Sequence, residues 1–214
     1  MKKLTLISLL IGALGLAGLA YGSYIYLKAI LGQQLIQMAW AKSQDSEQPH
    51  KPWPWADTWP LAKLRVPALD IEQVVLAGDS GQALAFGPGH RTGSALPGQP
   101  GTTLISGHRD THFRFMGQLH HGDELALVTT DGLRHSYQVV DTLVVPADFQ
   151  LPSTQEHRLV LATCWPLGTS LQRAKERYLV FAVPSPAVED QTPQTAPANP
   201  RLLSALPRAE TSNR

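Results

Sequence analysis

The first apolar stretch of the chain runs from Leu4 to Leu27 and contains no charged residue. At about 1.5 Å per residue, a helix of this length crosses a hydrocarbon core roughly 30 Å thick. Lys2 and Lys3 precede the stretch and Lys28 follows it. Lysines at the short N-terminal end favour a cytoplasmic N-terminus, with the rest of the chain outside. The pattern therefore predicts one transmembrane anchor over residues 1–31.

A cleaved signal peptide is the alternative interpretation of the same stretch. Gly18-Leu19-Ala20 has the small-x-small spacing of a cleavage site. The apolar run nevertheless continues from Tyr21 to Leu31, which is longer than the apolar region of a typical signal peptide. We favour an uncleaved anchor in the cytoplasmic (inner) membrane, crossing it once. Both interpretations place the following domain in the periplasm or otherwise outside the cytoplasm.

Residues 32–60 separate the anchor from the domain. Residues 33–42 can continue the helix, and Pro52, Trp53, Pro54, Trp55 and Pro60 then follow. Prolines at this density exclude a regular helix or a central strand. We predict a juxtamembrane linker rich in Pro and Trp, which either packs on the domain or lies at the membrane surface.

From residue 61 onward, short apolar runs alternate with turns rich in Gly and Pro. Asp131-Gly132 between two such runs is a strong hairpin signal. Many short strands with few helices are typical of a closed or nearly closed β-barrel, here over residues 61–184. The predicted strands cover residues 64–66, 71–76, 102–106, 124–129, 135–145, 159–163 and 178–183, with short helices over 83–86 and 113–119.

The remaining residues, 185–214, form the tail of the chain. Prolines are scattered there among Ala, Thr, Ser, Gln and Asn, and few apolar side chains are available to offset the entropy of ordering. We therefore predict a disordered tail. Across the whole chain the formal net charge is +1, and no stripe of basic residues occurs. Nucleic acid is accordingly not an expected partner.

Three residues with reactive side chains lie at the ends of predicted strands. His108 follows the run 102–106 after Gly107, Cys164 directly follows the run 159–163, and Arg177 directly precedes the run 178–183. A thiolate is the nucleophilic form of cysteine, and an imidazolium can stabilise it and then protonate a leaving amine. A guanidinium can stabilise an oxyanion. The three residues can thus supply the nucleophile, the acid/base group and the electrophilic stabiliser for acyl transfer.

The chain contains one cysteine, which excludes an intramolecular disulfide. An inert, buried Cys in an extracytoplasmic binding or scaffolding barrel is the alternative to a catalytic one. His108 and His112 have a spacing that could bind a metal on a helix, but Arg109 occupies the place of the Glu in the metalloprotease motif. We expect no metal and no cofactor.

Several motifs in the chain resemble those of the sortase family. TLISGHR at residues 103–109, LATC at 161–164 and ERYLV at 176–180 look like the His, Thr-x-Thr-Cys and Arg-strand motifs of sortases. HRDTHF at 108–113 and CWP at 164–166 most resemble the Gram-negative, marine proteobacterial type. The chain departs from the family at Leu161, where many members have Thr, and after Pro166, where related enzymes usually have Phe.

The resemblance implies an eight-stranded sortase-type β-barrel preceded by one transmembrane helix. It also implies a cysteine transpeptidase, a cysteine-type endopeptidase of the hydrolase class, which cleaves a C-terminal sorting signal of the Leu-Pro-x-Thr-Gly type. A thioacyl-enzyme would form and an acceptor amine would resolve it. A cysteine transpeptidase that acts on peptidoglycan is the alternative among enzymes. The implied catalytic residues are His108, Cys164 and Arg177, and the implied substrate contacts are Thr163, Trp165 and Pro166.

Overall fold

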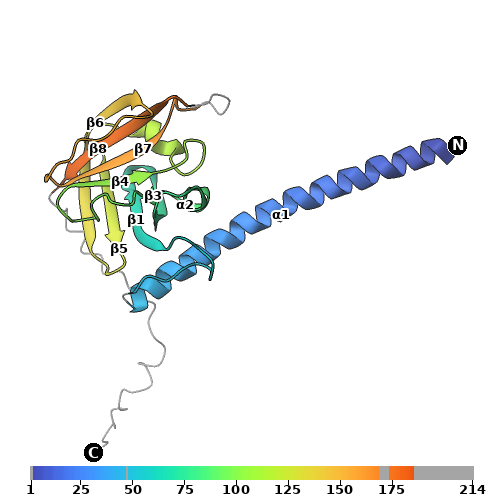
Figure 1. The fold of residues 1–214 in the computed structure, drawn as a ribbon, viewed down its shortest axis with the longest axis horizontal. Coiled ribbons are helices and arrows are strands. Elements are labelled where there is room, and N and C mark those ends of the chain that lie inside the picture. The colour runs from blue at the N-terminus through green and yellow to red at the C-terminus, as the bar shows by residue number, and fades with distance from the viewer. Residues whose placement is uncertain (1, 47, 169–173, 186–214) are drawn as a thin grey trace, which may run out of the picture.

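The computed structural model describes residues 2–46, 48–168 and 174–185. The predicted tail beyond residue 185 lies outside them, as does Arg173, the other arginine between Cys164 and the run 178–183. A long helix precedes a β-barrel with short helical segments (Figure 1). The elements are α1 (Lys2–Ser46), β1 (Pro60–Val66), η1 (Pro67–Leu69), β2 (Ile71–Ala77), α2 (Gly81–Phe86), β3 (Gly89–His90), β4 (Thr102–Ser106), η2 (Arg114–Gln118), β5 (Glu124–Thr129), β6 (Arg134–Pro146), β7 (Arg158–Trp165) and β8 (Glu176–Pro184).

The strands close into a barrel in the order β1-β2-β3-β4-β7-β8-β6-β5, and β5 pairs with β1. The predicted fold class is therefore confirmed. Two neighbouring pairs, β2 with β3 and β4 with β7, are parallel, and the others are antiparallel. Each predicted strand run is present, and β5 and β6 form the predicted hairpin. The sequence pattern missed β3, because its two residues, Gly89 and His90, resemble the turn residues that precede them.

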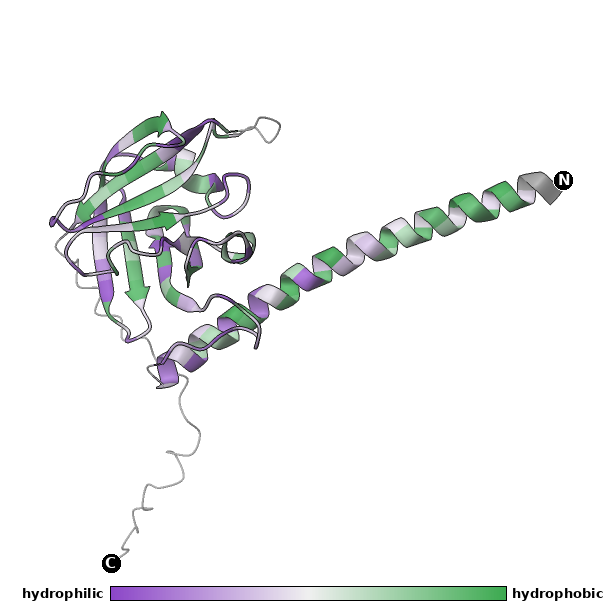
Figure 2. Cartoon of the chain, in the orientation of Figure 1, coloured by the Kyte–Doolittle hydropathy of each residue, from purple (hydrophilic) through white to green (hydrophobic). Residues whose placement is uncertain are grey.

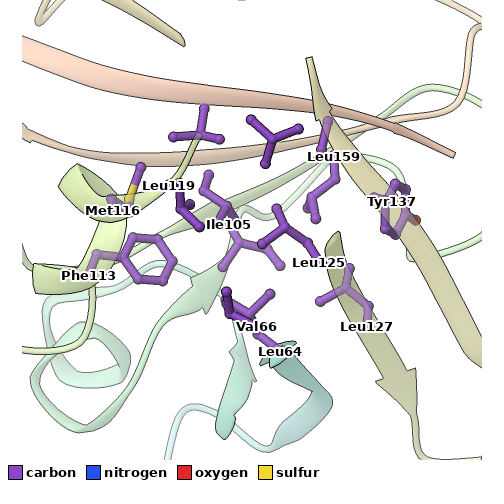
Figure 3. Packing of buried hydrophobic residues seen from close by; sticks show 14 of the residues in the cluster. Leu64, Val66, Ile105, Phe113, Met116, Leu119, Leu125, Leu127, Tyr137 and Leu159 are labelled. Atoms are coloured by element: carbon purple, nitrogen blue, oxygen red, sulfur yellow. The ribbon is translucent and has the colours of Figure 1, made fainter. Parts of the chain in front are cut away.

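The interior of the barrel is an apolar cluster to which most strands contribute (Figure 3). Inward and outward positions alternate along β1, as the period of two in a strand requires. Leu64, Ile105 and Leu159 are fully buried, as is Phe113, which lies next to η2. Phe113 and Met116 pack into this cluster from outside the sheet. The chain that follows β4 is thereby tied to the core.

Helix α1 continues beyond the predicted anchor and docks on the barrel. Its N-terminal part is strongly apolar (Figure 2). By length and composition, α1 can cross a membrane. Ile36 and Trp40 are buried in a second apolar cluster with β2 and α2. Trp53 of the Pro/Trp-rich segment packs edge-on against Phe86, at 4.9 Å between ring centroids. Helix α1 thus extends into the predicted linker as far as Ser46, and Trp53 packs on the domain.

The first contacts between α1 and the barrel come directly after the apolar run. Gln33 Nε2 donates to the carbonyl oxygen of Phe86 at 2.6 Å. A side chain on Gly32 would place a Cβ only 2.7 Å from the Phe86 ring, so the glycine permits this close approach. Lys63 Nζ lies 5.6 Å from the centroid of the Trp40 ring, within the range of a cation–π contact. Helix α1 therefore packs directly on the domain.

Candidate active site

The parallel pairing of β4 with β7 brings His108 and Cys164 to the same edge of the barrel. Ser106, the last residue of β4, pairs with Ala162, and β7 continues for three more residues to Trp165. Beyond this pair, Gly107 N donates to the Ala162 carbonyl at 3.1 Å. Thr163 Oγ1 donates to the Gly107 carbonyl at 2.7 Å. His108 follows Gly107 just beyond the end of β4, and Cys164 follows Thr163 within β7.

The backbone at Gly107 has a packing requirement of its own. A Cβ at this position would lie 2.7 Å from the ring of Phe113. Phe113 is fully buried, and its backbone N–H donates to the His108 carbonyl at 3.0 Å. The ring can therefore fill the core beneath the His108 loop only if residue 107 lacks a side chain. This is the physical reason for a glycine directly before His108.

Arg177 comes to the same site through the antiparallel pairing of β7 with β8. Cys164 and Arg177 are directly opposite each other in this pair. Side chains of directly opposite residues project to the same face, with Cβ atoms about 4.5–5.5 Å apart. Arg177 Nη1 donates to the carbonyl of Glu176 at 3.1 Å. Within the described residues Arg177 forms no ion pair with a carboxylate.

His108, Cys164 and Arg177 all line one groove with a volume of about 1060 Å³. Its other walls include residues 91–95 and the segment 149–155 between β6 and β7. Cys164 is partly exposed and His108 is exposed. An extended peptide could therefore reach the thiol while lying in the groove. The loop 149–155 lies outside every predicted strand, and its place in the wall was not predictable from the sequence.

Thr163, Trp165 and Pro166 differ in their relation to the groove. Thr163 borders it, but its side chain is only 3% exposed and its hydroxyl is bonded to Gly107. Trp165 stacks on Tyr178, with ring centroids 5.6 Å apart. Neither Trp165 nor Pro166 is among the described residues that line the groove. Their proposed contacts with substrate stay predictions.

His112, the second histidine of the loop, lies in a different environment. It is half-buried, and its carbonyl accepts a hydrogen bond from Gln73 Nε2 at 2.8 Å. Burial lowers the pKa of His112 below its ordinary value of 6.5, and the charge of His108 lowers it further. His112 is therefore a weaker base than a free histidine, and it is close enough to His108 to sense its charge.

The lowered pKa of His112 predicts a dependence of stability on pH. In the pH range between its folded pKa and about 6.5, the unfolded chain binds more protons at this site than the folded chain. Its contribution to stability is thus present above pH 6.5 and is lost as the pH falls through the folded pKa. Urea unfolding between pH 7.5 and 5 should show a smaller loss of stability in His112→Gln than in the wild type. Equal losses would contradict this prediction.

Comparisons with known proteins agree with this geometry. A family profile described as "Sortase domain" matches residues 64–185. Sortase D of Bacillus subtilis is 34% identical over 121 residues, which are 55% of this chain and 60% of that protein. The chain thus spans less than two thirds of the length of this curated relative.

Solved structures show the same barrel. Sortase C-1 from Actinomyces oris is 26% identical, with a TM-score of 0.52 over 60% of this chain and 76% of the other. The Clostridium perfringens Sortase D5 transpeptidase is 21% identical, with a TM-score of 0.56 over 72% of this chain and 96% of the other. The likeness to the latter supports the fold alone. Since the family profile covers more than half of the residues, from β1 through β8, this chain belongs to the sortase family.

Proposed function

We propose that this protein is a membrane-anchored cysteine transpeptidase that acts on a C-terminal sorting signal of the Leu-Pro-x-Thr-Gly type. The observation that carries the proposal is the meeting of Cys164, His108 and Arg177 in one groove, from three separate strand ends. Family membership supports the same reaction. The partners are a substrate protein with a sorting signal and an acceptor amine.

The reaction proceeds in two acyl transfers. The Cys164 sulfur attacks the carbonyl carbon of the Thr in the signal, and a C–S bond forms. The Thr–Gly C–N bond breaks as His108 donates a proton to the leaving amine. The nitrogen of the acceptor amine then attacks the thioacyl carbon, and His108 takes up its proton. A new C–N bond forms, the C–S bond breaks, and the thiolate is restored.

Cleavage of a fluorogenic Leu-Pro-x-Thr-Gly peptide tests this function. Purified protein should cleave the peptide and, with triglycine present, form the ligated product, whereas a scrambled peptide should not react. Rapid labelling of native Cys164 by iodoacetamide without peptide cleavage would show that the thiol is reactive but the substrate is wrong. An unreactive thiol in the native state would favour the binding or scaffolding barrel instead.

Arg177 is the proposed stabiliser of the oxyanion, and its replacement should lower activity strongly. We expect Arg177→Ala to lower kcat/KM about 100-fold or more, because a transition-state donor is lost. Arg177→Lys should recover little, because lysine lacks the planar fork of donors. If Arg177 formed only a surface pair, the change in stability would be no more than about 1 kcal/mol and turnover would not change. Arg173→Ala, the matched control, should stay within a few-fold of the wild type.

Helix α1 should anchor the protein in the cytoplasmic membrane, with the barrel on its outer side. Lys2 and Lys3 at the short end of the apolar run motivate this orientation. Protease added to spheroplasts should digest the barrel, while a cytoplasmic marker protein in the same cells stays intact. Full protection of the barrel until the membrane is dissolved would contradict the orientation.

A further inference from the structure

Arg109, the residue after His108, is buried although it carries a charge. Its side chain is 7% exposed, and it is the only Lys, Arg, Asp or Glu in the buried part of the chain that the structure describes. Taking a guanidinium out of water is costly unless hydrogen bonds and a counter-charge replace the water. A buried ion pair adds little net stability. The position and partners of the Arg109 guanidinium are therefore more informative than its contribution to stability.

The guanidinium of Arg109 connects two loops. Its Nε and Nη2 face the Asp110 carboxylate, at 3.2 Å from Oδ1 and 3.5 Å from Oδ2. Its Nη1 donates to the carbonyl oxygen of Pro166 at 2.9 Å, across 57 residues of sequence. The Asp110 side chain is 49% exposed, so water also reaches the carboxylate. Arg109 thus joins the loop after β4 to the loop after β7.

The bond between Arg109 and Pro166 lies on the C-terminal side of His108 and Cys164. On the N-terminal side of His108 and Cys164, the two segments are joined by the hydrogen bonds of Gly107 with Ala162 and Thr163. After them, they are joined by the bond of Arg109 to Pro166. Hydrogen bonds between the loops therefore flank both residues on both sides. The exposed His108 ring has no hydrogen bond to the described residues, so the backbone of the loop sets the point from which this side chain reaches Cys164.

We propose that Arg109 is a positioning residue that holds His108 within reach of Cys164 by donating to the Pro166 carbonyl. This inference rests on the proposed function, in which His108 donates a proton to the leaving amine and takes one from the acceptor amine. Proton transfer requires heavy atoms about 2.6–3.2 Å apart, and a displacement of about 1 Å can cost 100-fold in rate. Arg109 is not among the described residues that line the groove, so it acts through His108 and not on the substrate.

A double-mutant cycle with Arg109→Lys and His108→Ala tests this role. Arg109→Lys should lower kcat for the sorting-signal peptide about 30-fold or more and change KM less than about threefold, because lysine cannot reproduce the fork between Asp110 and Pro166. In the His108→Ala background the same substitution should change kcat by less than about threefold, because the residue through which it acts is gone. Arg114→Lys, an exposed arginine in η2, is the matched control and should leave kcat unchanged.

The reaction of Cys164 with iodoacetamide makes the test independent of the substrate. Since Cys164 is the only thiol, displacement of iodide by its sulfur can be followed in all four proteins of the cycle. If the wild type cleaves no sorting-signal peptide, the proposed substrate is wrong. The four proteins are then compared by their rates of Cys164 alkylation in place of kcat. Arg109→Met, which has no donor for Pro166, replaces Arg109→Lys if that variant does not fold. Equal losses in both backgrounds, or no loss in either, would overturn the inference.

Discussion

Replacing Cys164 by alanine is expected to abolish cleavage of a Leu-Pro-x-Thr-Gly peptide. The proposed mechanism passes through a bond to the Cys164 sulfur, and the chain has no second thiol to form it. Removing the nucleophile of a catalytic triad costs on the order of 10⁶ in kcat, so we expect a loss of at least about 10⁴-fold. Steady-state assays with the fluorogenic peptide measure this loss directly.

The same substitution should leave the barrel intact. Cys164 is partly exposed, and it lies outside the buried apolar clusters of the described residues. The free energy of unfolding should therefore change by about 1 kcal/mol or less. A thermal unfolding curve that matches the wild type, together with the lost activity, would separate chemistry from folding. Retained peptide cleavage by a folded Cys164→Ala protein would remove Cys164 from the mechanism.

His108→Ala is expected to lower kcat/KM by about 10²- to 10⁴-fold, the usual contribution of a general acid/base group. His108 directly follows the Gly107 link to β7 and lines the groove with Cys164. His112 is the natural control, because it lies in the same loop and its lowered pKa makes it a weaker base. His112→Ala should lose less than about tenfold.

The comparison of the two histidines also tests the assignment of roles. A larger loss in His112→Ala than in His108→Ala would transfer the acid/base role to His112. Adding imidazole to the assay offers a second measurement, because a small base that enters the groove should recover part of the activity of His108→Ala. The His112→Ala protein should not respond in this way.

Local pattern was sufficient to predict most elements of this protein. The uncharged run before Lys28 predicts a helix long enough for a membrane, and α1 contains it. Alternating or continuous apolar runs predict strands, because side chains on a strand project to opposite faces with a period of two. The same pattern places His108, Cys164 and Arg177 at strand ends. Family resemblance, carried by these residues, then indicated the barrel and the chemistry.

Pairing partners and strand directions, in contrast, were decided by the tertiary structure. A period of two specifies which face is buried but not which strand lies alongside, or whether it runs parallel. The parallel pairing of β4 with β7 joins residues far apart in sequence, and the register that places Cys164 opposite Arg177 follows from packing in the whole barrel. The two-residue strand β3 exists only because β2 and β4 flank it.

The burial of Arg109 is a further feature that the tertiary structure decided and the sequence pattern did not predict. In the sequence, an arginine next to an aspartate in a loop resembles a solvated ion pair, and pairs of this kind are usually exposed. Its partner, the Pro166 carbonyl, lies 57 residues away and is a backbone atom without a sequence signature. The sequence by itself therefore determined which reactive groups the protein possesses. The closed barrel alone decided their distances, because contacts between distant segments form only when the complete fold brings them together.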